Sequence, residues 1–111
     1  MKELIYTGNV AGLQFKPAYS LVKADLKTGD PLVLKVNKEN PYESHEKGAI
    51  EVYVNQEDEP VQIGFIQSKD LTQVHIILEN YQTEVICYRH TPENKPWARV
   101  TVGIYRKVDD A

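Results

Sequence analysis

Residues 37–54 read NKENPYESHEKGAIEVYV, and the second half of this stretch carries the clearest strand signal in the chain. Ile50, Val52 and Val54 alternate there with more polar neighbours. A repeat of two residues places successive side chains on opposite faces of a strand, so the three apolar side chains share one face. The stretch therefore predicts a β-strand that is buried on one side.

The first half of the stretch predicts a loop that presents a ligand contact. A turn signal, Asn40-Pro41, precedes an aromatic residue and a carboxylate, Tyr42-Glu43. Proline fixes its own φ and pushes the preceding residue toward extended geometry, so the loop is expected to hold Tyr42 and Glu43 at a defined angle. The alternative is that Glu43 is a solvated acid on an acidic loop.

The rest of the chain predicts further β segments and one helix. Residues 4–6 and 10–15 are expected to form one interrupted strand. The other expected strands cover residues 32–37, 61–65, 83–90 and 97–107. The helix is expected to begin near residues 68–70, because Asp70 and Gln73 have the spacing of a capping box. Its apolar stripe, formed by Leu71, Val74, Leu78 and Tyr81, must pack on the sheet. Residues 18–27 fit either a short strand or a helical turn.

Length and composition predict one folded domain. The chain has 111 residues, of which 26% are charged and 41% hydrophobic, and these are ordinary globular values. A single domain over residues 1–111 would bury somewhat more than ~60% of its unfolded surface. Cys87 has no partner for a disulfide, and no apolar run approaches the roughly 18 residues of a membrane span. Since no signal-peptide pattern opens the chain, we expect a soluble cytoplasmic protein with no membrane partner.

Charge is distributed unevenly along the chain. The formal net charge of −3 argues against a protein that holds nucleic acid mainly by covering phosphates. Residues 82–108 are nevertheless basic, with Arg89, Lys95, Arg99, Arg106 and Lys107 against Glu84 and Glu93. The last hairpin is therefore the part best suited to an anion, and a solvated surface of mixed charge is the alternative interpretation.

Several of these segments together resemble a HIRAN domain. The shared motifs are, in order, Asn40-Pro41-Tyr42-Glu43, Ala49-Ile50-Glu51-Val52 and Ile63-Gly64, with residues 10–15 similar to the family's opening strand. The resemblance covers nearly the whole chain. It departs at Glu43, where the family usually has Asp, and within residues 44–48, which include a few extra positions. It also departs on both sides of Phe15. Gln14 stands where the family commonly carries a basic residue, and Lys16 stands where it carries a second aromatic residue.

The resemblance implies an α+β fold, a small partly open six-stranded β-barrel with one helix packed against it between the fourth and fifth strands. It also implies binding of single-stranded DNA, preferably at a 3′ end, without catalysis and without a cofactor. In that role Phe15, Tyr42 and Trp97 would stack on bases or sugar. Glu43 would accept a hydrogen bond from the terminal 3′-hydroxyl. Phosphates would be neutralised by Lys16, Lys95 and Arg99. The expected protein partner is a helicase or repair protein acting in trans.

The last predicted strand gives Trp97 two interpretations. Ala98, Val100, Val102 and Ile104 alternate with Trp97, Arg99, Thr101 and Tyr105. If the first row faces the core, an indole, a guanidinium and a phenol share the outer face. Such a group suits stacking on exposed bases, worth ~1 to 3 kcal/mol per base. The rival interpretation is that Trp97 plugs the end of the barrel and Tyr105 packs on a neighbouring strand, because large aromatics are usually buried.

No catalytic or metal-binding pattern stands out. His45, His75 and His90 lack the spacing of metal ligands, and Cys87 lies in a β segment away from any helix N-terminus. We expect His75 to be a helix residue with a satisfied hydrogen bond and Cys87 to be a buried structural thiol. The chain contains no phosphate-binding glycine loop, so nothing points to nucleotide hydrolysis. From these observations together we expect neither an enzyme nor a metalloprotein.

Two other functions remain open. A protein-interaction or self-assembling module, and hence a homo-oligomer, would keep the fold and lack the DNA site. Gln14, Lys16 and the acidic net charge favour this alternative. A small hydrolase or nuclease would need an acid/base or metal constellation, which the sequence does not offer.

Overall fold

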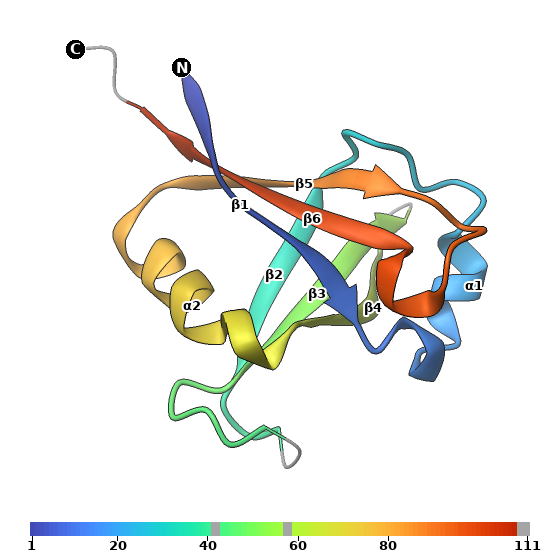
Figure 1. Ribbon diagram of the computed structural model, residues 1–111, viewed down its shortest axis with the longest axis horizontal. Helices are drawn as coiled ribbons and strands as arrows, with labels where there is room; N and C mark the ends of the chain where they lie inside the picture. Colours follow the sequence, from blue (N-terminus) through green and yellow to red (C-terminus); the bar gives the residue numbers. More distant parts are fainter. Residues whose placement is uncertain (41–42, 57–58, 109–111) are drawn as a thin grey trace.

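The structure is a computed structural model that describes residues 1–40, 43–56 and 59–108. Within these residues six antiparallel strands form a sheet with the order β2-β3-β4-β1-β6-β5. The strands are β1 (Lys2–Ala11), β2 (Leu32–Asn37), β3 (Ala49–Gln56), β4 (Glu59–Ile66), β5 (Thr83–His90) and β6 (Val100–Lys107). Helix α2 (Leu71–Asn80) joins β4 to β5, and the shorter α1 (Ala18–Val22) lies between β1 and β2 (Figure 1). Neither of these described helices has the length and apolar character needed to cross a bilayer.

Strand β1 links the two halves of the sheet. It pairs with β6 over most of its length and with β4 only at its end, through Val10 and Ala11 (Figure 1). The turn just ahead of β2 also bonds to β5 at the other edge, because Gly29 N donates to Cys87 O at 2.7 Å and Cys87 N donates to Asp30 O at 2.8 Å. These bonds close the barrel in part. The predicted α+β architecture, a partly open six-stranded barrel with a helix between the fourth and fifth strands, is therefore confirmed.

The alternating apolar residues form the core. On β3 the predicted face is buried, with Ile50, Val52 and Val54 at 7% exposure or less. On β6, Val100, Val102 and Ile104 are fully buried. Helix α2 adds Leu71, Val74 and Ile77 from one of its faces. Each fully buried aliphatic side chain contributes ~1.5–3 kcal/mol, so the core holds helix and barrel in one arrangement.

The first strand is continuous and ends earlier than predicted. β1 stops at Ala11, whereas the sequence pattern extended it to residue 15. Gly12 adopts a φ of 79°, a left-handed conformation that glycine tolerates without strain, and it turns the chain out of the sheet. The following Leu13–Phe15 forms a short 3-10 helix, η1. Phe15 is therefore presented by a turn.

The last strand begins later than predicted. Pro96–Ala98 forms another 3-10 turn, η3, and β6 starts at Val100. The hairpin is closed ahead of the strand by Thr91 N, which donates to Arg99 O at 2.8 Å. Ala98 therefore does not belong to the buried row of β6, and Trp97 precedes the strand.

Helix α2 begins at Leu71, after a 3-10 turn, η2 (Ser68–Asp70). The predicted capping box is wrong, because the side chain of Asp70 makes no capping hydrogen bond. Its carboxylate Oδ2 instead accepts a hydrogen bond from Tyr6 OH at 2.8 Å. Asp70 thus ties β1 to the start of the helix. Of the two structures open for residues 18–27, the helical turn is the one present, as α1.

Candidate nucleic-acid interface

A cavity of about 250 Å³ opens where the ends of β1 and β4 meet the loop between β2 and β3. Its lining includes Gly12, Phe15, Asn40, Glu43, Phe65 and Ser68. Two aromatic rings, a carboxylate, an amide and a hydroxyl therefore surround one space. A concave site with apolar walls and a few fixed polar groups is the usual form of a binding pocket.

Phe15 reaches this cavity from η1. The turn is fixed by Phe15 N, which donates to Gly12 O at 3.0 Å, and by Lys16 N, which donates to Leu13 O at 3.1 Å. Leu13 is buried and anchors the turn in the core, whereas Phe15 is 77% exposed. The fold thus leaves a large apolar ring in water at the edge of a cavity, where a flat ligand could cover it.

Phe65 lines the same cavity from the end of β4. A Cβ at Gly12 would lie 3.5 Å from this ring, so the ring packs against the glycine backbone. Lys16 Nζ lies 5.2 Å from the ring centroid, a distance at which the ammonium is attracted to the π face. The lysine therefore places a positive charge next to the cavity.

Glu43 is held in a fixed position at the cavity. Ser68 Oγ donates to Glu43 Oε2 at 2.7 Å, and His45 N donates to Glu43 Oε1 at 3.1 Å. The Ser68 hydrogen bond is the main cause that lowers the pKa of the Glu43 carboxyl, so the group is charged at neutral pH. A carboxylate oxygen accepts at two positions. With donors from Ser68, His45 and the Ser44 backbone, the carboxylate of Glu43 still retains an acceptor position for a ligand.

Lys95, Trp97 and Arg99 lie together on the hairpin between β5 and β6. Trp97 is 58% exposed, so the interpretation in which it plugs the barrel is wrong. Lys95 Nζ lies 5.4 Å from the centroid of the Trp97 ring, and Arg99 Nε donates to Asn94 O at 2.8 Å. Turn η3 contacts both η1 and β1, and Figure 1 shows the hairpin at the same end of the molecule as α1.

The structure thus places the predicted site residues in two neighbouring groups. Phe15 and Glu43 line the cavity, with Lys16 beside it, while Lys95, Trp97 and Arg99 lie on and next to η3. No residue from η3 is among the described lining residues. Tyr42 lies outside the described residues.

Sequence reasoning missed Phe65 and Ser68. Phe65 directly follows the Ile63-Gly64 motif, which was the one signal that pointed to its neighbourhood. Ser68 was noted only as a helix start, and its hydrogen bond to Glu43 spans 25 positions of the chain. Neither contact follows from local sequence pattern.

The histidines and the cysteine have structural partners. His75 is buried, and its Nε2 donates to Gly48 O at 2.8 Å, as predicted for a satisfied helix residue. Cys87 is fully buried, and burial raises the pKa of its thiol to about 11. The expectation of a buried structural thiol is confirmed. Across the described ranges, no group of three or more His, Cys, Asp or Glu could hold a metal ion.

Comparison with solved structures identifies the class of fold. The crystal structure of the HIRAN domain of human HLTF matches with a TM-score of 0.58 and 18% identity, over 96% of this chain and 80% of that chain. A crystal structure of a protein from Lactobacillus plantarum matches with a TM-score of 0.71 and 16% identity, over 96% of this chain and 95% of that chain. No family model and no curated protein sequence matches the chain. The fold is HIRAN-like, as the motifs predicted, and at these identities the likeness concerns the fold alone.

Proposed function

We propose that this protein binds single-stranded DNA, preferably at a 3′ end, and that it has no catalytic activity of its own. The observation that carries this proposal is the meeting, at one cavity, of an exposed aromatic ring from Phe15 and a fixed carboxylate from Glu43. The motif resemblance supports the same assignment, because HIRAN domains set an aromatic and an acidic residue against a DNA end. The HIRAN-like fold is consistent with it.

A terminal nucleotide suits the cavity better than the interior of a strand does. The cavity volume of about 250 Å³ lies below the ~300–1,000 Å³ of pockets for drug-sized ligands, which suits the terminal base or sugar of a strand and not a run of nucleotides. A free 3′-hydroxyl is a donor that only an end offers, and Glu43 is an acceptor held in place for it. The preference for ends therefore rests on a single hydrogen bond.

The remaining residues have roles that follow from their positions. Phe15 would stack on the terminal base, with Phe65 as part of the apolar wall beside it, and Trp97 would stack on the next base along the strand. Lys16 and Lys95 each lie on an aromatic ring, so they can meet a phosphate beside a stacked base. Arg99 would meet the backbone, and stacking by Tyr42 stays a prediction from the sequence.

Fluorescence anisotropy tests the proposal directly. Oligothymidylates with a free 3′-hydroxyl, a 3′-phosphate or a 2′,3′-dideoxy end are titrated at one stated salt concentration. The hydroxyl end is expected to bind most tightly, because the dideoxy end lacks the donor and the phosphate is repelled by Glu43. Equal affinity for all three would refute end recognition, and the absence of binding would refute the function.

Variants localise the binding site. Phe15→Ala is expected to cost ~1–3 kcal/mol of binding free energy through lost stacking. Leu21→Ala is the matched control, because Leu21 on α1 is 70% exposed and equally apolar but does not belong to the cavity lining. Glu43→Gln should reduce the preference for a hydroxyl over a phosphate end while binding is retained. A similar loss of affinity for Phe15→Ala and Leu21→Ala would place the site elsewhere.

A protein-interaction or self-assembling module is the second candidate, and one observation favours it. The exposed apolar side chains of Phe15, Leu21 and Trp97 lie on η1, α1 and η3, at one end of the molecule (Figure 1). Clustered exposed apolar residues are typical of a protein contact. A homo-oligomer seen by light scattering, disrupted by Trp97→Ala and indifferent to oligonucleotides, would favour this candidate. A helicase or repair protein in trans would use the same end.

A further inference from the structure

Strand β1 is paired along one edge and open along most of the other. Its residues 2–9 pair with β6, whereas β4 reaches β1 only at Val10 and Ala11. These two strands are the neighbours of β1 in the described sheet. In an antiparallel ladder the N–H and C=O groups of successive residues point to opposite edges. Alternate residues between Glu3 and Asn9 therefore present main-chain donors and acceptors to the side away from β6.

A groove of about 710 Å³ lies between the start of β1 and helix α2. Figure 1 shows β1 between β6 and α2 in this part of the molecule. The groove is lined by Glu3, Ile5, Lys69, Thr72, Gln73, Ile76, Ile77, Tyr81 and Arg106. None of these residues lines the cavity of the candidate nucleic-acid interface. The groove is therefore a separate site, and it is the larger of the two.

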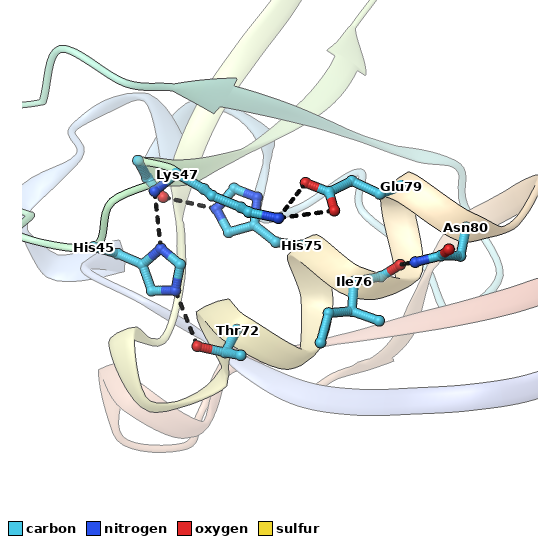
Figure 2. Close-up of polar contacts among 8 residues, drawn as sticks. His45, Lys47, Thr72, His75, Ile76, Glu79 and Asn80 are labelled. Atoms are coloured by element: carbon cyan, nitrogen blue, oxygen red, sulfur yellow. Dashed lines mark hydrogen bonds and ion pairs between the residues drawn. The ribbon is translucent and has the colours of Figure 1, made fainter.

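The helix side of the groove carries exposed apolar side chains. Positions 69, 72, 73 and 76 recur every three or four residues, so they form one stripe along the helix. Ile76 is 50% exposed within this otherwise polar stripe, and Tyr81 at the end of α2 is 44% exposed. Figure 2 shows the Ile76 side chain pointing away from Lys47, which pairs with Glu79. A ligand in the groove would cover both apolar side chains.

The charges around the groove favour a peptide over a nucleic acid. Arg106 Nη2 donates to Glu3 Oε2 at 3.1 Å, so these two charges satisfy each other. Lys69 forms no ion pair with another described residue. A nucleic-acid strand would bring one negative charge per nucleotide against this single unpaired cation. A peptide with one acidic residue beside Lys69 matches the charge of the groove.

We propose that this groove binds an extended peptide segment of a partner protein, which adds as a strand to the open edge of β1. Main-chain hydrogen bonds to alternate residues of β1 supply affinity, and alternate side chains of the segment pack on Ile5, Ile76 and Tyr81. The 10 residues of α2 extend for ~15 Å, which a strand of about five residues covers. This binding does not depend on the proposed DNA function.

The position of Lys69 fixes where the acidic residue of the segment belongs. Asp70, next to Lys69, accepts a hydrogen bond from Tyr6 OH, whereas Arg106 pairs with Glu3 near the start of β1. Lys69 therefore lies toward the later part of β1. Antiparallel addition, the arrangement of every described pair in this sheet, places the acidic residue at the N-terminal end of the segment.

A single segment fits the groove better than a second copy of this chain does. A segment added to β1 has α2 on its other side. A second copy would bring its own β6 directly behind its β1, ~4.8 Å further from the edge. Helix α2 occupies that direction, so the second strand would collide with it.

Hydrogen exchange of the protein alone tests the open edge. Alternate amides between Glu3 and Asn9 are expected to exchange at least about tenfold faster than the amides between them, which bond to β6. Uniform protection of all these amides would show that the edge is closed, and it would overturn the proposal whether or not the protein binds DNA.

An NMR titration with a synthetic peptide tests strand addition. The probe is an end-capped hexapeptide that begins with glutamate and continues with alternating valine and threonine. It is expected to shift signals of β1 and α2 and to slow exchange of the open-edge amides by about tenfold. No shift at the groove with about 1 mM probe, or shifts confined to β2 and β5, would overturn the proposal.

Two methylated probes separate main-chain pairing from simple burial. One carries N-methyl groups on its valines and the other on its threonines, so each removes the donors of one edge of the peptide. Because one edge faces β1, one of these probes is expected to bind at least about tenfold more weakly, and the other like the parent. Equal affinity of the three probes would overturn strand addition.

Variants test the two walls of the groove. Lys69→Glu is expected to weaken the glutamate probe about three- to tenfold and to favour a probe that begins with lysine. Ile76→Ala should weaken binding by about fivefold or more. Leu21→Ala is the matched control, because Leu21 is an exposed helix residue outside the groove. An equal loss in Leu21→Ala, or an unchanged charge preference in Lys69→Glu, would refute the assignment. A homodimer in light scattering that Ile76→Ala disrupts would overturn the choice of a partner segment.

Discussion

Substitution of Gly64 by alanine tests the junction that forms the cavity. A Cβ at Gly64 would lie 2.4 Å from Ala11 O and 2.5 Å from Val10 Cγ1. Carbon atoms in contact prefer ~3.5–4.0 Å, so the end of β1 must retreat by about 1 Å. Since β1 pairs with β4 only through Val10 and Ala11, this movement opens the link between the two halves of the sheet.

The size of the effect follows from two opposing terms. Overpacking costs ~1–3 kcal/mol, in the upper part of this range here because the obstacle is backbone. Alanine also restricts the unfolded chain, which offsets ~0.4–1 kcal/mol. We expect Gly64→Ala to lower the free energy of unfolding by ~2 kcal/mol and the Tm by ~8–10 °C, from the shift of ~4–8 °C per kcal/mol in slightly smaller domains.

Urea unfolding and calorimetry measure this loss, and Gly103 supplies the control. The nearest atoms to a Cβ at Gly103 would be Tyr88 Cβ and Cδ1, both at 3.1 Å, so a movement of a few tenths of an ångström would relieve the contact. Gly103→Ala should therefore cost less than half as much as Gly64→Ala. If the free energy of unfolding of Gly64→Ala lies within ~0.5 kcal/mol of the wild-type value, the steric account of the junction is refuted.

Three other predictions concern single side chains. Tyr6→Phe leaves the Asp70 carboxylate without its donor and should cost ~1.5–3 kcal/mol in denaturant unfolding, the range for hydrogen bonds to charged groups; an unchanged midpoint would contradict this. Thiol reagents at mildly alkaline pH should leave Cys87 unmodified in the folded protein and modify it once urea unfolds the chain, because burial raises its pKa to about 11. Ser68→Ala should raise the pKa of Glu43 in a carboxyl NMR titration, since the hydroxyl is the main cause of the lowered value. Because the pKa of Glu43 is lower in the folded state, the carboxylate stabilises the protein at pH values above its unfolded-state pKa. This contribution is lost as the pH falls through the folded-state pKa. The stability of Ser68→Ala should therefore depend less on acid than that of the wild type.

The fold was predictable where one face of a strand is buried. Ile50, Val52 and Val54 alternate because β3 lies over the core, and that pattern is local. The ends of β1 and β6 were not predictable from alternation alone. Apolar spacing continues through η1 and η3, and only the backbone turn at Gly12 and the pairing that begins at Val100 show where the sheet stops.

The candidate site was predictable only in part, for the same reason. Glu43 was suggested by the local turn signal at Asn40-Pro41 and by motif resemblance, and Phe15 by resemblance, which carries long-range information that periodicity lacks. The Ser68 hydroxyl that fixes Glu43, and the Phe65 ring under Lys16, depend on contacts between segments far apart in the chain. No local rule pairs such residues, because a loop can meet many elements of a barrel at similar cost.

The acidic charge of the protein constrains how the proposed site could hold DNA, and salt dependence tests this. The net charge is −3, and the cations assigned to the site are Lys16, Lys95 and Arg99. For single strands the slope of log K against log salt is about −0.7 per phosphate neutralised, so three contacts predict a slope of about −2. Arg99 already donates to Asn94 O, which makes a shallower slope the expected direction of any deviation. A slope steeper than about −4 would require six or more phosphate contacts. The three cations assigned to the site do not provide six phosphate contacts. Such a result would therefore show that DNA binds at another surface, and it would refute the proposed stacking and the proposed recognition of the 3′-hydroxyl.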